Sequence, residues 1–260
     1  DWYRNLLPFN NFLKFRASWG RVGNDRLKDE NGNDIRFPYL TTLGNVSSTW
    51  GTGLAENRTG SMNLKWEVST KTNFGIDARF FDDKVDMTVD FFHTKTTDIF
   101  QRRANIPDEG GLSNVLPYAN IGSMKSWGMD GTLAYTHTFN KDMALTVRGN
   151  FTHAENEVIY WEQSGVNYPY QSNSGVPYKV QRGLIALGLF KDEDDIKSSP
   201  KQTFMDNYRP GDIKYKDVNG DGKIDKDDVV PLNYSAVPFI QYGFALDWNY
   251  KAFRVSILFE

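Results

Sequence analysis

Residues 217–228, Asp-Val-Asn-Gly-Asp-Gly-Lys-Ile-Asp-Lys-Asp-Asp, have the composition and spacing of a calcium-binding loop. Side-chain oxygens are expected to act at loop positions 1, 3, 5 and 12, a backbone carbonyl at position 7, and a water-mediated ligand at position 9. The residues at these positions are Asp217, Asn219, Asp221, Lys223, Asp225 and Asp228. Gly222 occupies position 6, where the sharp turn favours a residue without a Cβ atom, and Ile224 at position 8 is the expected apolar plug.

The alternative for this segment is a surface turn that binds no ion, because Asp, Asn and Gly also favour turns through their backbone preferences. Position 12 carries Asp228 in place of glutamate, and the shorter side chain reaches less readily for bidentate coordination. No nucleophile or base stands close by in the sequence. The predicted calcium is therefore structural and not catalytic.

A second chemical feature is a cluster of aromatic residues in the long polar stretch that precedes this loop. We predict that three of them border a substrate site, because flat rings with polar rims stack on sugars and pack on peptides. They are Trp161, Tyr168 and Tyr170. Internal packing of a large loop is the alternative interpretation.

The sequence does not support a transition-metal site, an enzymatic activity or nucleic-acid binding. The three histidines, His93, His137 and His153, lack metal-ligand spacing, and the chain has no cysteine, so a zinc or transition-metal site is not predicted. Paired carboxylates fall in polar loops or turns, and no nucleophile or phosphate-binding motif occurs, so we predict no enzymatic activity. With 30 basic and 33 acidic residues mixed along the chain, nucleic acid is not an expected partner.

The elements that must position these residues are β-strands. Apolar and polar residues alternate in seven segments, and aromatic residues make up 15% of the chain, a balance that favours strands over helices. The expected strands cover residues near 13–19, 66–81, 85–91, 127–138, 143–151, 240–250 and 253–259. Several reach or exceed the ~9–11 residues that cross a bilayer, whereas strands of soluble proteins average ~5–6.

The connections between these strands alternate in length. Turns near Asp82, Lys141 and Lys251 are very short, whereas residues 21–65, 98–122 and 159–236 form long connections. Short turns at one end and long loops at the other are typical of transmembrane β-barrels, and the aromatic residues beside the short turns fit an interfacial girdle. A soluble sandwich, which also needs one apolar and one polar face, is the alternative. The sequence contains no run of about 18 apolar residues, so a transmembrane helix is not predicted.

Four segments resemble the C-terminal half of SusC/RagA-type TonB-dependent outer-membrane transporters. These are residues 13–24 (LKFRASWGRVGN), 63–75 (NLKWEVSTKTNFG), 120–130 (NIGSMKSWGMD) and 211–222 (GDIKYKDVNGDG). Trp127 and Asp130 stand where the family usually has Asn and Glu. The resemblance covers nearly the whole chain.

The resemblance implies an all-β fold, in which residues 1–260 are part of a 22-stranded antiparallel barrel in the Gram-negative outer membrane. Residues 159–236 would be a long extracellular loop region containing the calcium loop. The family imports oligosaccharides or peptides with energy from the TonB complex, and pairs with a SusD-like surface lipoprotein that closes as a lid. Seven strands cannot close such a barrel, so the N-terminal plug and the TonB-contacting segment are expected elsewhere. Residues 1–4 do not resemble a signal peptide, and we expect any export signal upstream.

A different class of function remains open from the residues alone. A secreted, calcium-stabilised β-protein that binds carbohydrate or a protein partner would also have alternating strands and one calcium loop. The two hypotheses differ in the apolar face of the strands, which contacts outer-membrane lipid in the first and a protein core in the second.

Overall fold

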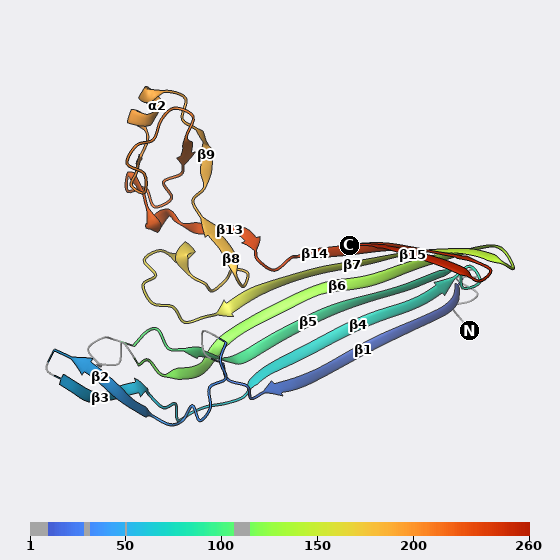
Figure 1. The fold of residues 1–260 in the computed structure, drawn as a ribbon, viewed down its shortest axis with the longest axis horizontal. Coiled ribbons are helices and arrows are strands. Elements are labelled where there is room, and N and C mark those ends of the chain that lie inside the picture. Colours follow the sequence, from blue (N-terminus) through green and yellow to red (C-terminus); the bar gives the residue numbers. More distant parts are fainter. Residues whose placement is uncertain (1–9, 29–31, 50, 107–114) are drawn as a thin grey trace.

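The computed structural model describes residues 10–28, 32–49, 51–106 and 115–260. Residues 1–4, considered above for an export signal, lie outside the described residues. Seven long strands form one sheet in the order β1-β4-β5-β6-β7-β14-β15, and every neighbouring pair is antiparallel (Figure 1). The strands are β1 (Asn10–Asn24), β4 (Glu67–Phe80), β5 (Val85–Arg102), β6 (Tyr118–Asn140), β7 (Met143–Tyr160), β14 (Ile240–Tyr250) and β15 (Phe253–Phe259).

All seven predicted strands are present, and the all-β fold is confirmed. The short turns also lie where the alternation predicts them, between β4 and β5, β6 and β7, and β14 and β15. Asp82 and Asp83 adopt positive φ values of 55° and 61° in the first turn, a conformation that Asp tolerates better than most residues. These turns gather at one end of the sheet, and the long connections leave from the other (Figure 1).

The predicted connection 98–122 is too long. Strand β5 continues to Arg102, and β6 already begins at Tyr118. The register of the pair shifts between Thr96 and Ile99, and Asp98 has a φ of 55°. A bulge of this kind interrupts the alternation of side chains while the strands stay paired, so the periodicity stops before the strand does.

The long connections carry smaller elements that the alternation does not predict. Strands β2 (Thr42–Ser48) and β3 (Gly51–Arg58) pair as a separate ribbon, and the connection between β7 and β14 folds into a module that projects from the sheet (Figure 1). The module contains the short pairs β8–β13, β9–β11 and β10–β12. Its elements are η2 (Pro169–Gln171), β8 (Val180–Gly183), β9 (Ala186–Leu189), α2 (Glu193–Ser198), β10 (Lys201–Gln202), β11 (Ile213–Tyr215), β12 (Lys223–Ile224), η3 (Lys226–Asp228) and β13 (Val230–Ser235). In the described ranges, no helix is long and apolar enough to span a membrane.

The register aligns apolar residues of all seven strands on one face of the sheet. One row across the strands runs from Phe15 through Ile76, Val89, Gly131 and Phe151 to Tyr242. Phe15, Phe151 and Tyr242 expose 59%, 39% and 72% of their surface. On β7 the apolar positions extend from Met143 to Phe151, which is about 27 Å along the strand and about 20 Å along the normal of a sheet with barrel tilt.

The opposite face is polar, and several of its charges are paired across strands. Arg16 of β1 contacts Asp77 of β4 at 3.0 Å and Asp90 of β5 at 2.7 Å. Gly75 lies between them in the same row, and a Cβ atom there would fall 2.7 Å from the Arg16 Cζ atom and 2.5 Å from the Asp90 Oδ1 atom. The absence of a side chain at Gly75 thus lets one guanidinium bridge three strands.

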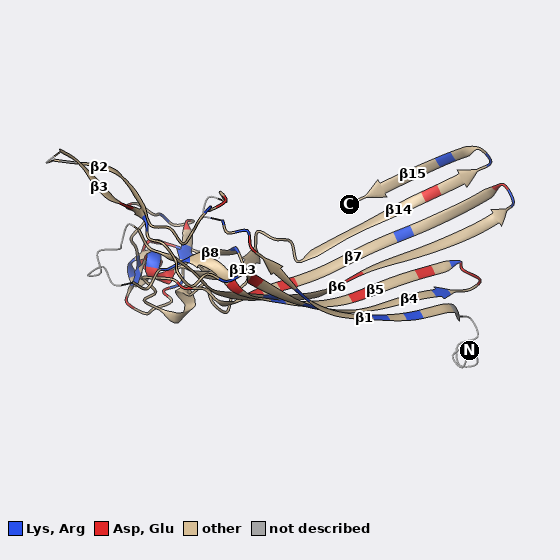
Figure 2. Ribbon diagram, turned by 90° about the horizontal axis from the view of Figure 1, so that it is seen from below, with Lys and Arg blue, Asp and Glu red and all other residues tan. Residues whose placement is uncertain are grey.

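A second ionic cluster lies on the polar face toward the short turns. Asp247 of β14, 4% exposed, accepts hydrogen bonds from Arg148 at 2.7 Å, Arg254 at 3.4 Å and the Ser256 hydroxyl at 2.5 Å. Figure 2 shows these charges as isolated bands on strands that are otherwise free of charge along most of their length. Charges of both signs on this face thus form ion pairs within the sheet.

Candidate functional site

A polar hollow lies where β5, β6 and β7 leave the sheet for the long connections. We call it the mouth cavity. Its volume is about 620 Å³, and its lining includes Gln101, Arg103, Tyr118, Trp161, Glu162 and Tyr178. Phe100 also lines it, and the Phe100 ring stacks on Tyr118 with centroids 4.8 Å apart and an interplanar angle of 6°. Aromatic faces and hydrogen-bonding groups therefore border the same space.

Gln101 is the most unusual residue of the mouth cavity. Only 4% of its surface is exposed, yet neither its amide nitrogen nor its amide oxygen has a hydrogen-bond partner in the structure as described. Leaving a buried polar group unpaired costs about 1–3 kcal/mol. An amide can donate and accept at once, so Gln101 suits a ligand that presents both a hydroxyl or N–H and a carbonyl.

The charged pair of the mouth cavity is held rigidly. Glu162, 7% exposed, accepts hydrogen bonds from the Arg103 side chain at 2.8 Å and from the Ala104 N–H at 2.9 Å. Burial alone would raise the pKa of Glu162, but these hydrogen bonds outweigh it, and the pKa of the carboxyl lies below its usual value. The Glu162 carboxylate is therefore ionised at neutral pH, and its contact with Arg103 anchors the end of β7 to the end of β5.

Trp161 follows β7 directly and lines the mouth cavity, as expected of a residue that borders a substrate site. Its backbone N–H donates to the Ser174 hydroxyl at 3.0 Å. Arg182 of β8 donates to the carbonyls of Tyr170 at 3.1 Å and Ser172 at 2.5 Å, which fixes the loop that follows Trp161. The indole is thus presented by a segment with a defined backbone.

Tyr168 and Tyr170 are not among the residues that line the mouth cavity. Their rings stack on each other, with centroids 5.3 Å apart. The Tyr170 hydroxyl donates to the Asp227 carbonyl at 2.6 Å, and burial together with Tyr168 and nearby carboxylates raises the pKa of Tyr170. The Asn219 amide approaches the Tyr168 hydroxyl at 3.3 Å. The structure thus places the tyrosine pair against the predicted calcium loop.

The predicted calcium loop is closed by hydrogen bonds from backbone N–H groups to its own side chains. Asp217 accepts from Gly220 at 2.6 Å and from Gly222 at 2.8 Å. Asn219 and Asp221 each accept from the N–H two residues on, at 3.0 and 2.9 Å. Gly222 has a φ of 83°, in the left-handed region where a Cβ atom is unfavourable, so the predicted role of this glycine in the turn is confirmed.

The end of the loop is buried. Asp228 is 0% exposed and accepts hydrogen bonds from the N–H groups of Val218 at 2.7 Å and Asp225 at 2.9 Å, which joins the two ends of the loop. Ile224 is also fully buried and pairs with Gln202 where β12 lies parallel to β10. Ile224 therefore packs the loop onto its neighbour, as predicted.

The ligand set fits calcium in its chemistry, because every predicted ligand except the Lys223 carbonyl is a carboxylate or an amide oxygen, and each carboxylate oxygen can accept more than one bond. In the described ranges, however, no three His, Cys, Asp or Glu side chains converge as a metal-binding group. Calcium therefore stays a prediction for these residues.

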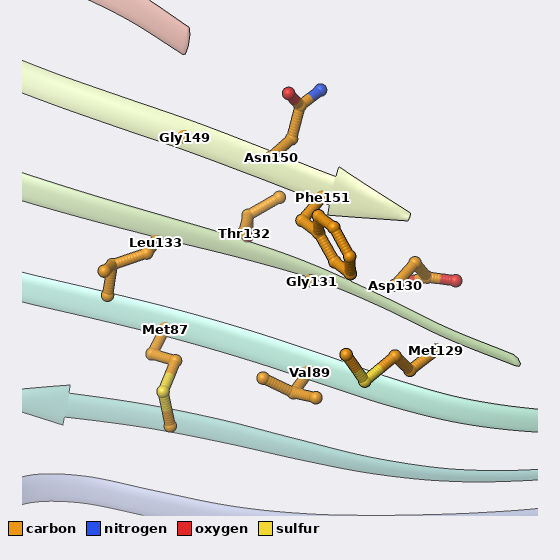
Figure 3. Close-up of a pocket in the computed structure, with 10 residues that line it drawn as sticks. All are labelled: Met87, Val89, Met129, Asp130, Gly131, Thr132, Leu133, Gly149, Asn150 and Phe151. Carbon is orange, nitrogen blue, oxygen red and sulfur yellow. The ribbon is translucent and has the colours of Figure 1, made fainter. Parts of the chain in front are cut away.

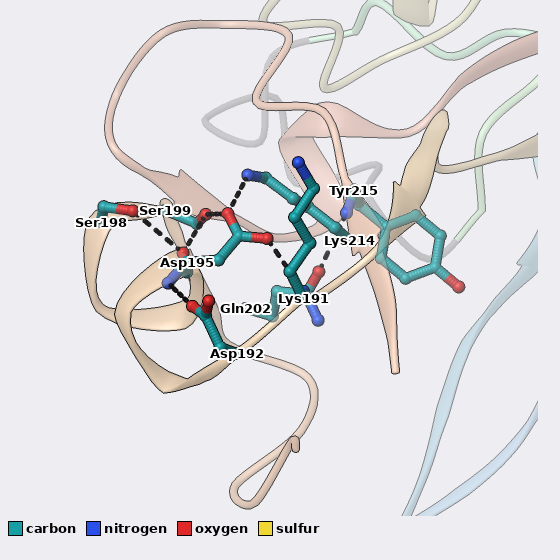
Figure 4. Close-up of polar contacts among 8 residues, drawn as sticks. All are labelled: Lys191, Asp192, Asp195, Ser198, Ser199, Gln202, Lys214 and Tyr215. Carbon is teal, nitrogen blue, oxygen red and sulfur yellow. Dashed lines mark hydrogen bonds and ion pairs between the residues drawn. The ribbon is translucent and has the colours of Figure 1, made fainter. Parts of the chain in front are cut away.

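The acidic run at residues 192–195 has a structural role. Asp192 caps helix α2 by accepting from the Asp195 N–H at 2.8 Å, and Asp195 binds the Lys214 Nζ atom at 2.8 Å (Figure 4). The Lys191 N–H also donates to Asp195 at 3.1 Å. Lys214 and then Lys191 lower the pKa of Asp195. This carboxylate joins α2 to β11, a role for which the sequence carries no signal.

A second hollow, of about 360 Å³, lies on the apolar face. Its floor is formed by Gly131 and Gly149, and the side chains of Met87, Met129 and Phe151 stand around it (Figure 3). Because Gly131 and Gly149 replace larger residues in two adjacent rows of the register, the face is indented there. We call this hollow the glycine depression. It suits hydrocarbon, and it is distinct from the polar mouth cavity.

A sheet with one apolar face and alternating short and long connections is characteristic of a membrane barrel. The sequence of residues 3–256 matches the family described as "TonB dependent receptor-like, beta-barrel". The chain belongs to this family of TonB-dependent receptors. The family is one of receptors and transporters and is not an enzyme class.

Relatives of known sequence agree with this assignment. TonB-dependent receptor P39 of Formosa agariphila is 30% identical over 99% of this chain, which covers 27% of the relative. TonB-dependent receptor SusC of Bacteroides thetaiotaomicron is 25% identical over 94% of this chain and 24% of its own length. The resemblance to SusC/RagA-type proteins is thus confirmed. The chain spans about a quarter of the length of these relatives.

Solved structures show the same fold. The RagAB peptide importer in the "open-open" state superposes with a TM-score of 0.70 at 22% identity, over 98% of this chain and 27% of that one. The "closed-closed" state gives a TM-score of 0.67 at 21% identity. The seven-stranded sheet is therefore a segment of a TonB-dependent receptor barrel, with β1 and β15 at its two edges.

Proposed function

We propose that this chain forms part of the wall and the extracellular loops of an outer-membrane importer of oligosaccharides or peptides. The observation that carries the proposal is the continuous apolar face, about 20 Å tall along the membrane normal, on a sheet whose other face is polar and carries ion pairs. A secreted β-protein would have to cover that face with a second layer. The uncovered apolar face and the membership in the family of TonB-dependent receptors both favour an importer over a secreted β-protein.

The orientation of the sheet in the membrane follows from its apolar and polar faces and from the different lengths of the connections at its two ends. The apolar face contacts lipid, and the polar face lines the barrel lumen, where water solvates its charges. The short turns lie on the periplasmic side, and the module between β7 and β14 lies outside the cell with the mouth cavity at its base. Energy comes from the TonB complex through segments of the whole protein beyond this barrel portion.

A SusD-like lipoprotein lid is the proposed partner of the extracellular module. The support is an exposed apolar surface on the β9–β11 ribbon: Leu187, Leu189 and Ile213 expose 59%, 61% and 44% of their surface. Ile213 and Leu189 are direct partners in the ribbon. Clustered apolar residues of this kind are characteristic of protein contacts.

The uptake experiment that tests the proposal uses the cells that produce the full-length protein. Deletion of its gene should abolish uptake of one labelled ligand class, either mixed oligosaccharides or mixed peptides, and the intact gene supplied in trans should restore it. Unchanged uptake of both classes in the deletion strain would contradict the proposal.

The mouth cavity is the proposed substrate contact, and its residues give a sharper prediction. Replacing Gln101 and Trp161 with alanine in the full-length protein should weaken ligand binding about tenfold or more, because a stacking surface is lost together with an amide that would pair with the ligand. Binding of the ligand that the uptake assay identifies is measured by calorimetry. Tyr234→Ala, which removes an exposed ring of β13 that does not line the cavity, is the control; equal affinity for the double variant and the wild type would exclude the cavity.

We further propose that residues 217–228 bind calcium as a structural ion. Calorimetry on the full-length protein should show one calcium taken up, with a dissociation constant on the order of 10⁻⁴ M or tighter. Asp217→Asn with Asp221→Asn should abolish this uptake, whereas Asp194→Asn, at a side chain that is 94% exposed on α2, should not change it. Absence of heat from calcium in the wild-type protein would refute the assignment.

A further inference from the structure

The apolar face ends, toward the long connections, in an aromatic row followed by a basic row. In the first row, Trp19, Thr72, His93, Trp127 and Glu155 lie side by side on β1, β4, β5, β6 and β7. Two residues farther along each strand, the second row contains Arg21, Thr70, Lys95, Lys125 and Glu157. We call the second one the basic row.

The basic row lies on the same face as the apolar belt. Side chains alternate along a strand, and the register between Phe91 and Lys95 on β5, and between Lys125 and Met129 on β6, is free of shifts. Lys95 and Lys125 therefore follow Phe91 and Met129 on one surface. Lys71, which is opposite Gly20 and Thr94, lies at the same height on the polar face.

The charges of the basic row are incompletely balanced. Lys95 and Lys125 are direct cross-strand partners, an arrangement of like charges that destabilises a sheet. Lys125 is compensated by Glu157 at 2.9 Å and lies 5.3 Å from the Trp127 ring centroid. Glu155, in the row below, contacts the His153 ring at 3.4 Å.

Lys95 and Arg21 have no such compensation. Both residues are exposed, and in the described part of the chain no carboxylate lies within 4.0 Å of either cationic group. They flank Thr70 and stand two strand spacings apart, about 10 Å, so both long side chains reach a group placed over Thr70. An anion there would relieve the repulsion between Lys95 and Lys125.

The surface below the basic row suits hydrocarbon. On β6 the sequence of same-face residues runs from Lys125 through Trp127 and Met129 to Gly131, which forms the floor of the glycine depression. Tryptophans mark the boundary between hydrocarbon and headgroups in membrane barrels. The basic row thus lies at headgroup depth, directly above an indented apolar surface.

We propose that Arg21, Lys95 and Lys125 bind the phosphate of an outer-leaflet lipid, whose acyl chains lie over Trp127 and the glycine depression. The inference rests on the proposed orientation in the outer membrane. A lipid is favoured over free phosphate because the cationic and the apolar surfaces are continuous on the same strands. The site would fix the wall of the barrel in its lipid surroundings.

The test uses the delipidated full-length protein in neutral detergent and native mass spectrometry. The probes are a diphosphorylated lipid A, the same lipid without its phosphates, and inorganic phosphate. The variant R21Q/K95Q removes two charges from the basic row, and K14Q/K71Q removes two from the polar face as the matched control. Resistance of the unheated barrel to SDS verifies that each variant is folded.

The wild type should bind the phosphorylated lipid at least tenfold more tightly than its phosphate-free form. R21Q/K95Q should weaken that binding about twentyfold, and K14Q/K71Q should leave it unchanged, because each basic residue near a charged lipid contributes about 1 kcal/mol. Equal binding by R21Q/K95Q and the wild type would overturn the proposal, as would displacement of the lipid by low millimolar inorganic phosphate. Substrate uptake, measured separately, reports on the transport function and not on this site.

Discussion

Replacing Leu133 with arginine is expected to destabilise the full-length protein in the membrane by about 2–4 kcal/mol, the cost of a cation near the bilayer midplane on the lipid side of a barrel. Leu133 lies in the middle of the apolar rows, next to Met87 and Gly149, and 53% of its surface is exposed. Urea unfolding in lipid vesicles, followed by tryptophan fluorescence, measures the free energy of unfolding.

The matched control for Leu133→Arg is the preceding residue. Thr132 lies on the polar face, between Thr88 and Asn150, where a charged side chain would reach water in the lumen. Thr132→Arg should change the free energy of unfolding by less than about 1 kcal/mol. If the two arginine variants were equally stable, the assignment of the two faces would be wrong.

The second large effect is expected at Gly128, in the middle of β6. A Cβ atom there would overlap the His153 carbonyl oxygen and lie 2.9 Å from the Ala154 Cα atom, both backbone atoms of β7. Gly128→Ala would push the two strands apart, since the backbone cannot rotate away as a side chain can. We expect a loss of about 3 kcal/mol in the free energy of unfolding and a lower level of folded barrel in the outer membrane.

Gly149→Ala is the control for this substitution. At Gly149, on β7, the nearest atom to the added Cβ would be the Gly243 carbonyl oxygen at 3.9 Å, an ordinary contact. This variant should assemble as the wild type does. If Gly128→Ala were as stable as the wild type, the close approach of β6 and β7 at this point would be contradicted.

The strands were predictable because each side chain of a membrane barrel faces either lipid or water, and the alternation is therefore continuous over many residues. The same physics explains the errors. The bulge at Asp98 breaks the alternation while pairing continues, so the alternation ends β5 too early and begins β6 too late. The ribbons β8–β13 and β9–β11 join segments about 20–50 residues apart through strands of three to six residues, too short to show a period.

The candidate site was predictable only in part. Trp161 was identified from its aromatic, loop-rich surroundings and does line the mouth cavity. Gln101 and Glu162 were missed, because a single Gln in a strand and a single Glu after one carry no pattern, and only the fold brings them together. The roles of Tyr168 and Tyr170 depend on contacts with residues 219 and 227, which sequence spacing does not predict.

The central claim is that one face of this sheet contacts lipid and the other contacts water. This chain contains no cysteine; single cysteines are placed at residues 129–133 of β6 in the full-length protein, after any cysteine elsewhere in it has been replaced, and are spin-labelled in outer-membrane vesicles. Collision with oxygen, which concentrates in lipid, is compared with collision with a water-soluble nickel complex. Collisions of the spin label with oxygen should be the more frequent at positions 129, 131 and 133, and collisions with the nickel complex at positions 130 and 132. Equal access of nickel to all five positions would contradict the account.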